Sequence, residues 1–365
     1  MGDTRLQSDV EKLNRRYVLS SKSIKRRIVN DYEYAYELAE QLDIKLDIPK
    51  YKVEINDSTL FSNQVAEYIF DMESIADVVI GMFKSMDFYN FKRLGNYRIS
   101  KKETEELMKS FLDYFLSDLY YIYLDLLKDD RVYITDLGTN LGESFFLNSL
   151  HSYYMSLSEN NKNPILMMET IIHELVHIYS FIFLSNYRYK GIDNLNNGFF
   201  GETLSLYSEL SLYEFLKGTY IFGDGLELQR NSVDFNLLCY FKTVKYLAEM
   251  MKRPGAIATT NNCDYEIFGD NLLDIEPADT IYYYHPSYSK GSILDCRYAM
   301  SSIDAFKLLE REKNGEDPGK LMREYLIDFQ DEAQMGKFLD SYIDLDFMYH
   351  TIEDRNMSLK KRFFK

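Results

Sequence analysis

Residues 173–177 read His-Glu-Leu-Val-His, and their types and spacing suit the binding of a metal ion. Residues four apart lie on one face of a helix, so His173 and His177 can direct ring nitrogens at one point. Two neutral imidazoles at this spacing suit zinc, which takes nitrogen ligands in a tetrahedral arrangement. Glu174 projects beside that point, where it could take a proton from a water molecule that the metal has made more acidic. The motif therefore predicts a Zn²⁺ site with Glu174 as the general base.

A catalytic zinc site also needs a third protein ligand and an open position for water. Glu202 lies 25 residues after His177, at the start of a predicted amphipathic helix over about 203–217, and Glu209 follows two turns later on roughly the same face. Either carboxylate could bind the metal, but about 10 Å along the helix separates them, so both cannot bind directly. We take Glu202 as the ligand. Glu209 is then either a partner that orients a histidine ring or a polar residue of the helix face.

Three further acidic or histidine residues are weaker candidates for the site. Glu169 lies four residues before His173 and could orient a ring, although a capping or solvated carboxylate in the first helical turn is favoured. His151 and His350 have no motif around them, and we predict that both are ordinary structural histidines.

The candidate oxyanion donors lie further along the chain. Attack of water on an amide makes a tetrahedral oxyanion, which a Tyr hydroxyl or a His N–H can stabilise. His285 and Tyr288 stand in a Gly- and Pro-punctuated stretch, which favours an exposed loop, and Tyr298 follows in the next predicted helix. The chain has 32 tyrosines, so packing or surface roles compete strongly with catalysis for both tyrosines.

HELVH followed by Glu202, Ser205 and Glu209 resembles the zinc oligopeptidases of the thimet oligopeptidase and oligopeptidase F group. In that family a ligand Glu follows the first motif by about 25 residues, with a Ser three and a Glu seven positions later. The family's Pro-Ser-Gln is Leu204-Ser205-Leu206 here, so the match is partial. The stretch Tyr282–Tyr288, followed by Gly291 and Tyr298, also resembles the family's downstream Tyr and His segment. The resemblance spans about 140–310.

This resemblance implies a zincin-like metallopeptidase catalytic core and a gluzincin-type endopeptidase that cleaves oligopeptides. It implies zinc ligands His173, His177 and Glu202, with His285 or a neighbouring Tyr at the oxyanion. In that family a strand before the zinc helix lines the cleft, and an extended peptide pairs with its edge. Gly142 to Leu150 could be that strand, or a core strand with no free edge.

The elements that would position these residues are mainly helical, because most of the chain has helical hydrophobic period. Ser100 with Glu103 has the spacing of a capping box, and Asn163 before Pro164 is a helix start signal. Strands are predicted over 131–136 and within 145–157, directly before the zinc helix. Helices are predicted over about 65–88, 101–128, from 164, and over 203–217, 232–252, 292–313 and 331–347. The expected fold is mainly α with one small sheet beside the HELVH helix.

Composition narrows the function classes. The chain has 365 residues, 58 acidic and 42 basic, for a net charge of -16, which argues against nucleic acid as the main partner. Three distant cysteines argue against a disulfide framework, and no apolar run approaches a membrane span. We therefore expect a soluble, cytoplasmic protein. The expected division is a helical region over 1–130 that packs on or caps the core and a zincin-like catalytic region over 131–365; one continuous domain is the alternative.

Two other classes of function compete with the peptidase. A zinc-binding protein that has lost catalysis could bind a peptide or a partner through the same cleft, although it would not need Glu174. A helical scaffold in which HELVH is accidental would hold no stoichiometric zinc. The sequence does not decide the substrate's length, the oligomeric state or the choice between endo- and exopeptidase action.

Overall fold

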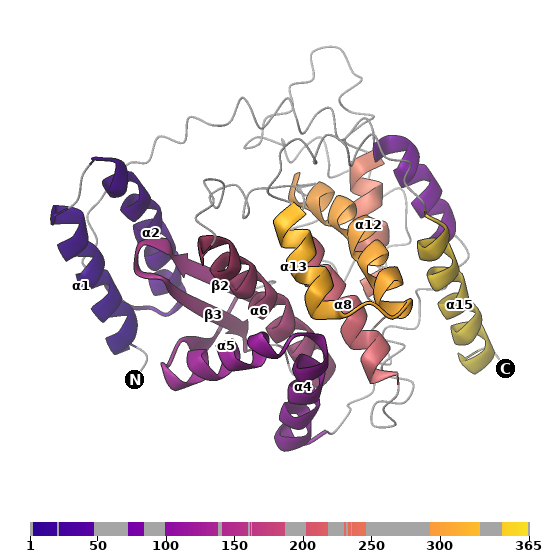
Figure 1. Cartoon of the computed structure of the whole chain (residues 1–365), viewed down its shortest axis with the longest axis horizontal. Coiled ribbons are helices and arrows are strands. Elements are labelled where there is room, and N and C mark those ends of the chain that lie inside the picture. The colour runs from indigo at the N-terminus through magenta and orange to yellow at the C-terminus, as the bar shows by residue number, and fades with distance from the viewer. Residues whose placement is uncertain are drawn as a thin grey trace, which may run out of the picture. The chain divides into compact units, whose positions relative to one another are not determined.

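The computed structural model describes residues 3–19, 22–46, 72–83, 99–137, 141–159, 161, 163–186, 202–217, 230, 233–234, 236–245, 293–328 and 345–363. Helices make up 78% of the residues described, with one small three-stranded sheet, which confirms the mainly α fold class (Figure 1). The chain forms two compact units. The first comprises 1–54, 97–192 and 317–330, and the second comprises 55–96, 193–316 and 331–365.

The first unit holds the sheet and the helix that carries HELVH. Its elements are α1 (Asp3–Leu19), α2 (Lys22–Gln41), α4 (Lys101–Phe115), α5 (Ser117–Lys128), β1 (Val132–Thr135), β2 (Gly142–Leu147), η2 (Asn148–Leu150), β3 (Ser152–Ser158), α6 (Pro164–Asn186) and α13 (Pro318–Asp328). The predicted boundary between residues 130 and 131 lies within this unit, and the division into a capping and a catalytic region stays a prediction.

The sheet has the order β1-β3-β2, with β1 parallel and β2 antiparallel to β3. The strand predicted over 131–136 is confirmed as β1. The stretch 145–157 is not one strand, because it turns through η2 and through His151, whose φ is 51°. Among the strands that the structure describes, β2 lies at an edge and pairs with β3. The choice between a strand with a free edge and a core strand with no free edge stays a prediction.

Helices cover both faces of this sheet. Successive side chains of a strand point to opposite sides, so neighbouring residues of β2 contact different helices. Phe145 and Leu147 of β2 are buried in a cluster with residues of α1 and α2. Between them, Phe146 packs on Phe181 of α6, with ring centroids 4.7 Å apart. Figure 1 shows α2 and α6 beside β2. The residues of β2 that precede Phe146 by two and four positions therefore also face α6.

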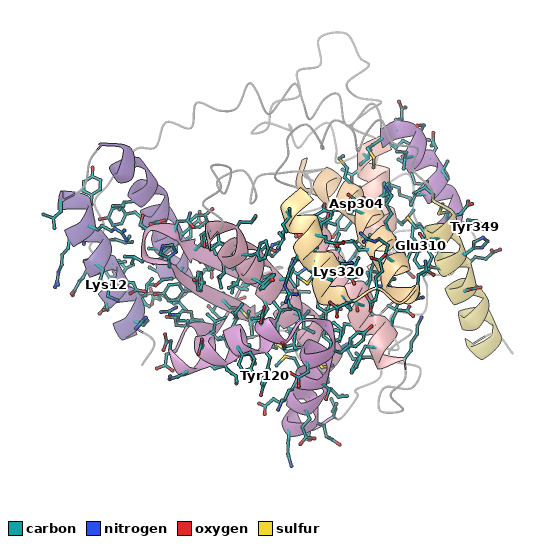
Figure 2. The ribbon with its side chains drawn as sticks, in the orientation of Figure 1. Lys12, Tyr120, Asp304, Glu310, Lys320 and Tyr349 are labelled. Atoms are coloured by element: carbon teal, nitrogen blue, oxygen red, sulfur yellow. The ribbon has the colours of Figure 1, made fainter. Side chains whose placement is uncertain are left out.

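Two buried aspartates attach the first two helices to the strands. Asp9 of α1 accepts hydrogen bonds from Tyr154 Oη at 2.7 Å and Ser152 Oγ at 2.9 Å. Lys12, labelled in Figure 2, donates to the same carboxylate at 2.6 Å. Burial alone would raise the pKa of Asp9, but these hydrogen bonds outweigh burial and hold it below its ordinary value.

Asp31 of α2 performs a similar role at the turn between β2 and β3. Its carboxylate accepts from the backbone N–H of Asn148 at 2.9 Å and of Ser149 at 2.8 Å. Complete burial raises the pKa of Asp31 to about 6, although these hydrogen bonds act in the opposite direction. The second helix thus holds the turn that sets the path of β2.

The helix start signals are confirmed. Asn163 Oδ1 caps α6 by accepting from Ile165 N at 3.0 Å and Leu166 N at 3.3 Å. The Ser100–Glu103 capping box is present at the start of α4. The single helix predicted over 101–128 is wrong, because the chain is extended at Leu116, between α4 and α5.

The break at Leu116 coincides with a tertiary contact. No Pro or Gly precedes it in the helix, but Leu116 packs against Gly319 of α13, where a Cβ would lie 3.1 Å from Leu116 Cδ1. The main-chain oxygen of Phe115 lies close to the same glycine, at 3.4 Å from that position. The contact comes from a helix about 200 residues later in the sequence, so local patterning does not report it.

By length and composition, α6 could cross a membrane over Pro164–Ser185, contrary to the prediction that no apolar run approaches a membrane span. Within the protein, 67% of the most apolar window is buried, as in the core helix of a soluble protein. The finding is weak evidence for a membrane span, and the absence of one stays a prediction.

The second unit consists of packed helices. Its elements are α8 (Thr203–Leu216), α12 (Ile293–Lys313) and α15 (Asp346–Phe363), with helical segments at 72–83 and 236–245. The helices predicted over 203–217 and 292–313 are confirmed, and the described parts of 65–88 and 232–252 are helical. Most of the helix predicted over 331–347 lies outside the described residues. Ser211 of α8 donates to Glu312 of α12 at 2.8 Å, which joins these two helices.

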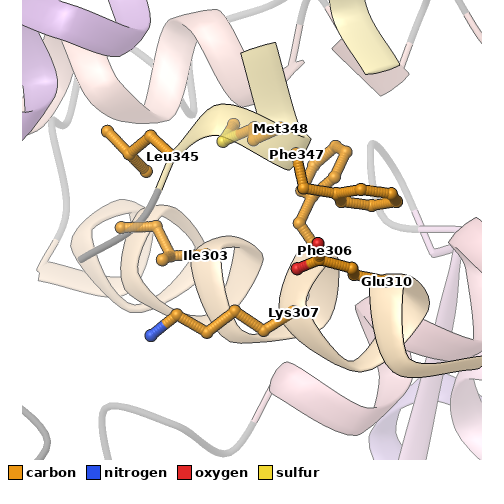
Figure 3. A pocket seen from close by; sticks show the side chains of 7 residues that line it. All are labelled: Ile303, Phe306, Lys307, Glu310, Leu345, Phe347 and Met348. Carbon is orange, nitrogen blue, oxygen red and sulfur yellow. The ribbon is translucent and has the colours of Figure 1, made fainter. Parts of the chain in front are cut away.

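A small hollow opens between α12 and the start of α15, lined by the side chains shown in Figure 3. It has room for about one water molecule. Near it on α12, Asp304 (Figure 2) lies 3.5 Å from Lys307 and is almost fully buried, and burial raises its pKa to about 7. The hollow is too small for a peptide, so it does not compete with α6 as a functional site.

Candidate metal centre

The two histidines of HELVH lie on one face of α6 and point their ring nitrogens at each other. Nε2 of His173 and Nε2 of His177 are 3.1 Å apart, and both side chains are half-buried. The ring centroids are 4.8 Å apart and the ring planes are inclined by 72°. The spacing of four residues has therefore produced the predicted convergence of two imidazole nitrogens.

This separation fits a zinc ion. Two nitrogens that each lie about 2.0–2.1 Å from a tetrahedral zinc are about 3.3–3.4 Å apart. The Nε2–Nε2 distance of 3.1 Å is a few tenths shorter, within the range that small ring rotations cover. The same distance also suits an N–H···N hydrogen bond between neutral rings when no cation is bound. The pair is thus already close to the geometry that a cation requires.

Glu174 follows His173 on α6, and its carboxylate accepts a hydrogen bond from β2. Its side chain is 6% exposed. Ser144 of β2 donates a hydrogen bond to Glu174 Oε2, and Ser144 Oγ lies 3.2 Å from the main-chain oxygen of Glu174. A buried carboxylate on the residue that follows His173 is what the motif predicts for a general base.

Gly142 lets the edge strand approach the helix closely. A Cβ at this position would lie 2.6 Å from Thr170 Cγ2, 3.2 Å from Glu174 Cγ and 3.4 Å from Glu174 Oε1. Only a residue without a side chain fits at the first distance. Thr170 is itself fixed, because its hydroxyl donates to Leu166 O at 2.7 Å and accepts from Asn161 Nδ2 at 3.3 Å.

The predicted third ligand belongs to the second unit. Glu202 is half-buried and directly precedes α8, whose first turn closes with a hydrogen bond from Leu206 N to Glu202 O at 2.9 Å. His173 and His177 offer imidazole nitrogens and Glu202 offers a carboxylate, which are donor atoms of the kinds that zinc takes. Glu209 lies two turns into α8 and is only 8% exposed. The choice between a partner of a histidine ring and a polar residue of the helix face stays a prediction.

The structure corrects the interpretation of Glu169. It is 8% exposed, and Asn163 caps the helix, so Glu169 is neither solvated nor the capping carboxylate. Its position four residues before His173 keeps it on the face of α6 that carries both histidines.

Of the remaining candidates, Tyr298 is the one that falls within the described residues. It is half-buried in α12 and its ring stacks on Tyr240, with centroids 5.0 Å apart. His285 and Tyr288 lie outside the described residues. His151 is exposed in the turn before β3, and His350 is exposed on α15 with Glu353 at 3.9 Å, so neither is buried in a site.

Sequence reasoning missed Ser144 and Thr170 as neighbours of the site. The signal was the alternation along β2, where Gly142, Ser144 and Phe146 share the face that meets α6. Two small residues followed by an aromatic residue on one face indicate a close strand–helix contact that widens toward Phe146. The partner of this face was not evident without the fold.

Comparisons with known proteins give no match. No family model, no curated protein and no solved structure matches the chain. The resemblance to zinc oligopeptidases therefore stays a prediction, and the proposed chemistry rests on the contacts of the residues themselves.

Proposed function

We propose that the protein is a zinc-dependent metallopeptidase with a zincin-like catalytic core that hydrolyses peptide bonds in oligopeptides. One observation carries the proposal. Two imidazole nitrogens lie 3.1 Å apart on α6, and Ser144 donates a hydrogen bond to the carboxylate of Glu174, the residue that follows His173. A purely structural pair of histidines would not need an oriented acidic neighbour between them in the sequence.

His173, His177 and Glu202 would hold the metal. When bound, zinc would polarise the scissile carbonyl and make a neighbouring water molecule more acidic. Glu174 would take the proton from that water during attack and later deliver it to the leaving amine nitrogen. The helix fixes the two histidines and Glu174 relative to one another, so these groups need little rearrangement during the reaction.

The edge strand β2 would bind the substrate backbone. An extended peptide that pairs with a sheet edge gains main-chain hydrogen bonds without demanding particular side chains. Gly142 and Ser144 at the start of β2 contact Thr170 and Glu174 of α6, so a peptide along this edge would pass the general base. This supports an enzyme of broad sequence preference.

The donors for the oxyanion stay proposals from the sequence. His285 and Tyr288 would stabilise the negative charge that develops on the carbonyl oxygen, with Tyr298 as a further candidate. Tyr298 stacks on Tyr240, so it would need its hydroxyl, rather than its ring face, to reach the substrate.

The test combines metal analysis with peptide cleavage. Purified protein is analysed for zinc by mass spectrometry and is incubated with a mixed peptide library whose products are read by mass. We expect about one zinc per chain and cleavage that a chelator abolishes. Glu174→Gln should keep its zinc and lose turnover, whereas His173→Ala should lose both.

Other outcomes would assign the protein to a different class. Zinc without cleavage by the wild-type protein would indicate a binding protein that has lost catalysis. Absence of zinc from the wild type, even after incubation with the metal, would contradict the proposal and favour a helical scaffold.

A further inference from the structure

We infer that Ser144 is a positioning residue that fixes the carboxylate of Glu174 for proton transfer, an inference that rests on the proposed function. Ser144 lies on β2 and Glu174 on α6, 30 residues later in the chain. Its role would be to orient the general base, without contact with the metal.

The contact is well suited to that role. The Ser144 hydroxyl donates to one carboxylate oxygen, Oε2, and lies 3.2 Å from the main-chain oxygen of the same glutamate. Hydrogen bonds to an ionised acceptor are about twice as strong as neutral ones. A single hydroxyl that reaches both the end of the side chain and its main chain restricts the rotamers that Glu174 can adopt.

The two oxygens of Glu174 have different surroundings. Among the residues that the structure describes, Ser144 is the one that donates a hydrogen bond to this carboxylate. The other oxygen, Oε1, lies beside Gly142, where a Cβ would be 3.4 Å away. Ser144 therefore occupies Oε2, and the glycine leaves space next to Oε1.

Orientation matters because a general base must lie within about 2.6–3.2 Å of the group whose proton it takes. A glutamate without this hydrogen bond can rotate about three side-chain bonds, and most of the resulting positions miss that range. Loss of Ser144 should thus slow the chemical step while leaving the substrate-binding edge of β2 and both histidines in place.

The experiment compares Ser144→Ala with Ser144→Thr, which keeps a hydroxyl at the same position of the strand. In the zinc-loaded protein we expect Ser144→Ala to lower kcat about tenfold with unchanged KM and zinc content, and Ser144→Thr to recover most of the loss. In the Glu174→Gln background, Ser144→Ala should have no further effect on the residual rate. Ser185→Ala is the matched control, because that α6 serine donates to Ile182 O and should leave kcat unchanged.

A second readout uses the metal-free protein. Urea unfolding of wild type, Ser144→Ala, Glu174→Ala and the double variant forms a double-mutant cycle. We expect the two sites to be coupled by about a factor of ten in the unfolding equilibrium constant, as for a hydrogen bond to a charged group.

The inference is overturned if the two sites are uncoupled in metal-free protein, or if Ser144→Thr loses as much kcat as Ser144→Ala. It is also overturned if Ser144→Ala raises KM or lowers zinc content at constant kcat. Failure of the proposed function looks different, because the wild type would then neither retain zinc nor cleave peptides while the coupling persists. That result would remove the positioning role together with the enzyme.

Discussion

Replacing Gly142 by alanine should disturb the contact between β2 and α6. The added Cβ would lie 2.6 Å from Thr170 Cγ2, about 0.8 Å closer than the 3.4 Å at which ordinary contacts begin. The backbone itself permits alanine, because φ at Gly142 lies outside the left-handed region. The cost is therefore steric, and its size depends on which side moves.

Thr170 cannot move cheaply. Rotating its methyl group away would also displace the hydroxyl, which bonds to Leu166 O at 2.7 Å and to Asn161 Nδ2 at 3.3 Å. The strand should move instead, at the usual overpacking cost of about 1–3 kcal/mol. Because Glu174 Cγ would lie 3.2 Å from the new methyl, the general base should shift as well. A misplacement of about 1 Å can cost about 100-fold in rate, so we expect a loss of tenfold or more in kcat.

The assay is chemical unfolding together with peptide cleavage for Gly142→Ala, Thr170→Ser and the double variant. Serine lacks Cγ2 and keeps the hydroxyl, so the double variant should recover most of the stability that Gly142→Ala loses. Gly81→Ala is the control, because a Cβ there meets nothing within 4 Å and should not destabilise the helix. Full stability of Gly142→Ala, or no relief by Thr170→Ser, would refute the steric argument.

Three further predictions concern the framework of the first unit. Asn163→Ala removes the cap of α6 and should lower the free energy of unfolding by about 1 kcal/mol in urea titrations; an unchanged midpoint would contradict the capping role. Asp9 has a lowered pKa in the folded protein. Its contribution to the free energy of unfolding is therefore fully present above its ordinary pKa of 3.8, and is lost as the pH falls through the lower pKa of the folded state. In urea titrations, the free energy of unfolding of wild type should therefore exceed that of Asp9→Asn by about 2 kcal/mol at pH 6, and that difference should shrink at pH 3. The pKa of Asp31 is raised to about 6 in the folded protein, so as the pH falls the folded state takes up this proton before the unfolded state does. The free energy of unfolding should therefore rise by up to about 3 kcal/mol between pH 7 and pH 4. Asp31→Asn should lack this rise. If its free energy of unfolding follows the same pH profile as that of wild type, Asp31 is not the source of the rise.

Short-range signals in the sequence were sufficient for the helix that carries the site. Asn163 and Pro164 lie next to the residues that they organise, and His173 and His177 are one turn apart, so helix geometry alone brings their rings together. The mainly α class followed from the same periodicity. These predictions needed no knowledge of what the helix packs against.

The features that the sequence did not reveal depend on contacts between distant segments. Asp31 holds a turn more than 110 residues later in the chain, and the break at Leu116 lies against Gly319. Ser144 reaches Glu174 because the strand folds back onto the helix, which no local pattern specifies. Hydrophobic period identifies which residues are buried, but it does not identify their partners.

The same distinction applies to the metal ligands. His173 and His177 belong to one turn, whereas Glu202 was chosen by its distance in the sequence and by the ligand chemistry of zinc. The structure gives the geometry of the histidine pair. The role of the Glu202 carboxylate, which belongs to the second unit, is tested by metal binding.

The central claim is that two imidazoles and the Glu202 carboxylate bind one zinc ion while Glu174 stays free of it. X-ray absorption of zinc-loaded protein tests this directly. The account predicts two imidazole nitrogens and carboxylate or water oxygens at about 2.0–2.2 Å, with Glu202→Ala losing an oxygen neighbour and Glu174→Gln leaving the spectrum unchanged. A sulfur neighbour, or a spectrum that changes with Glu174→Gln and not with Glu202→Ala, would contradict it.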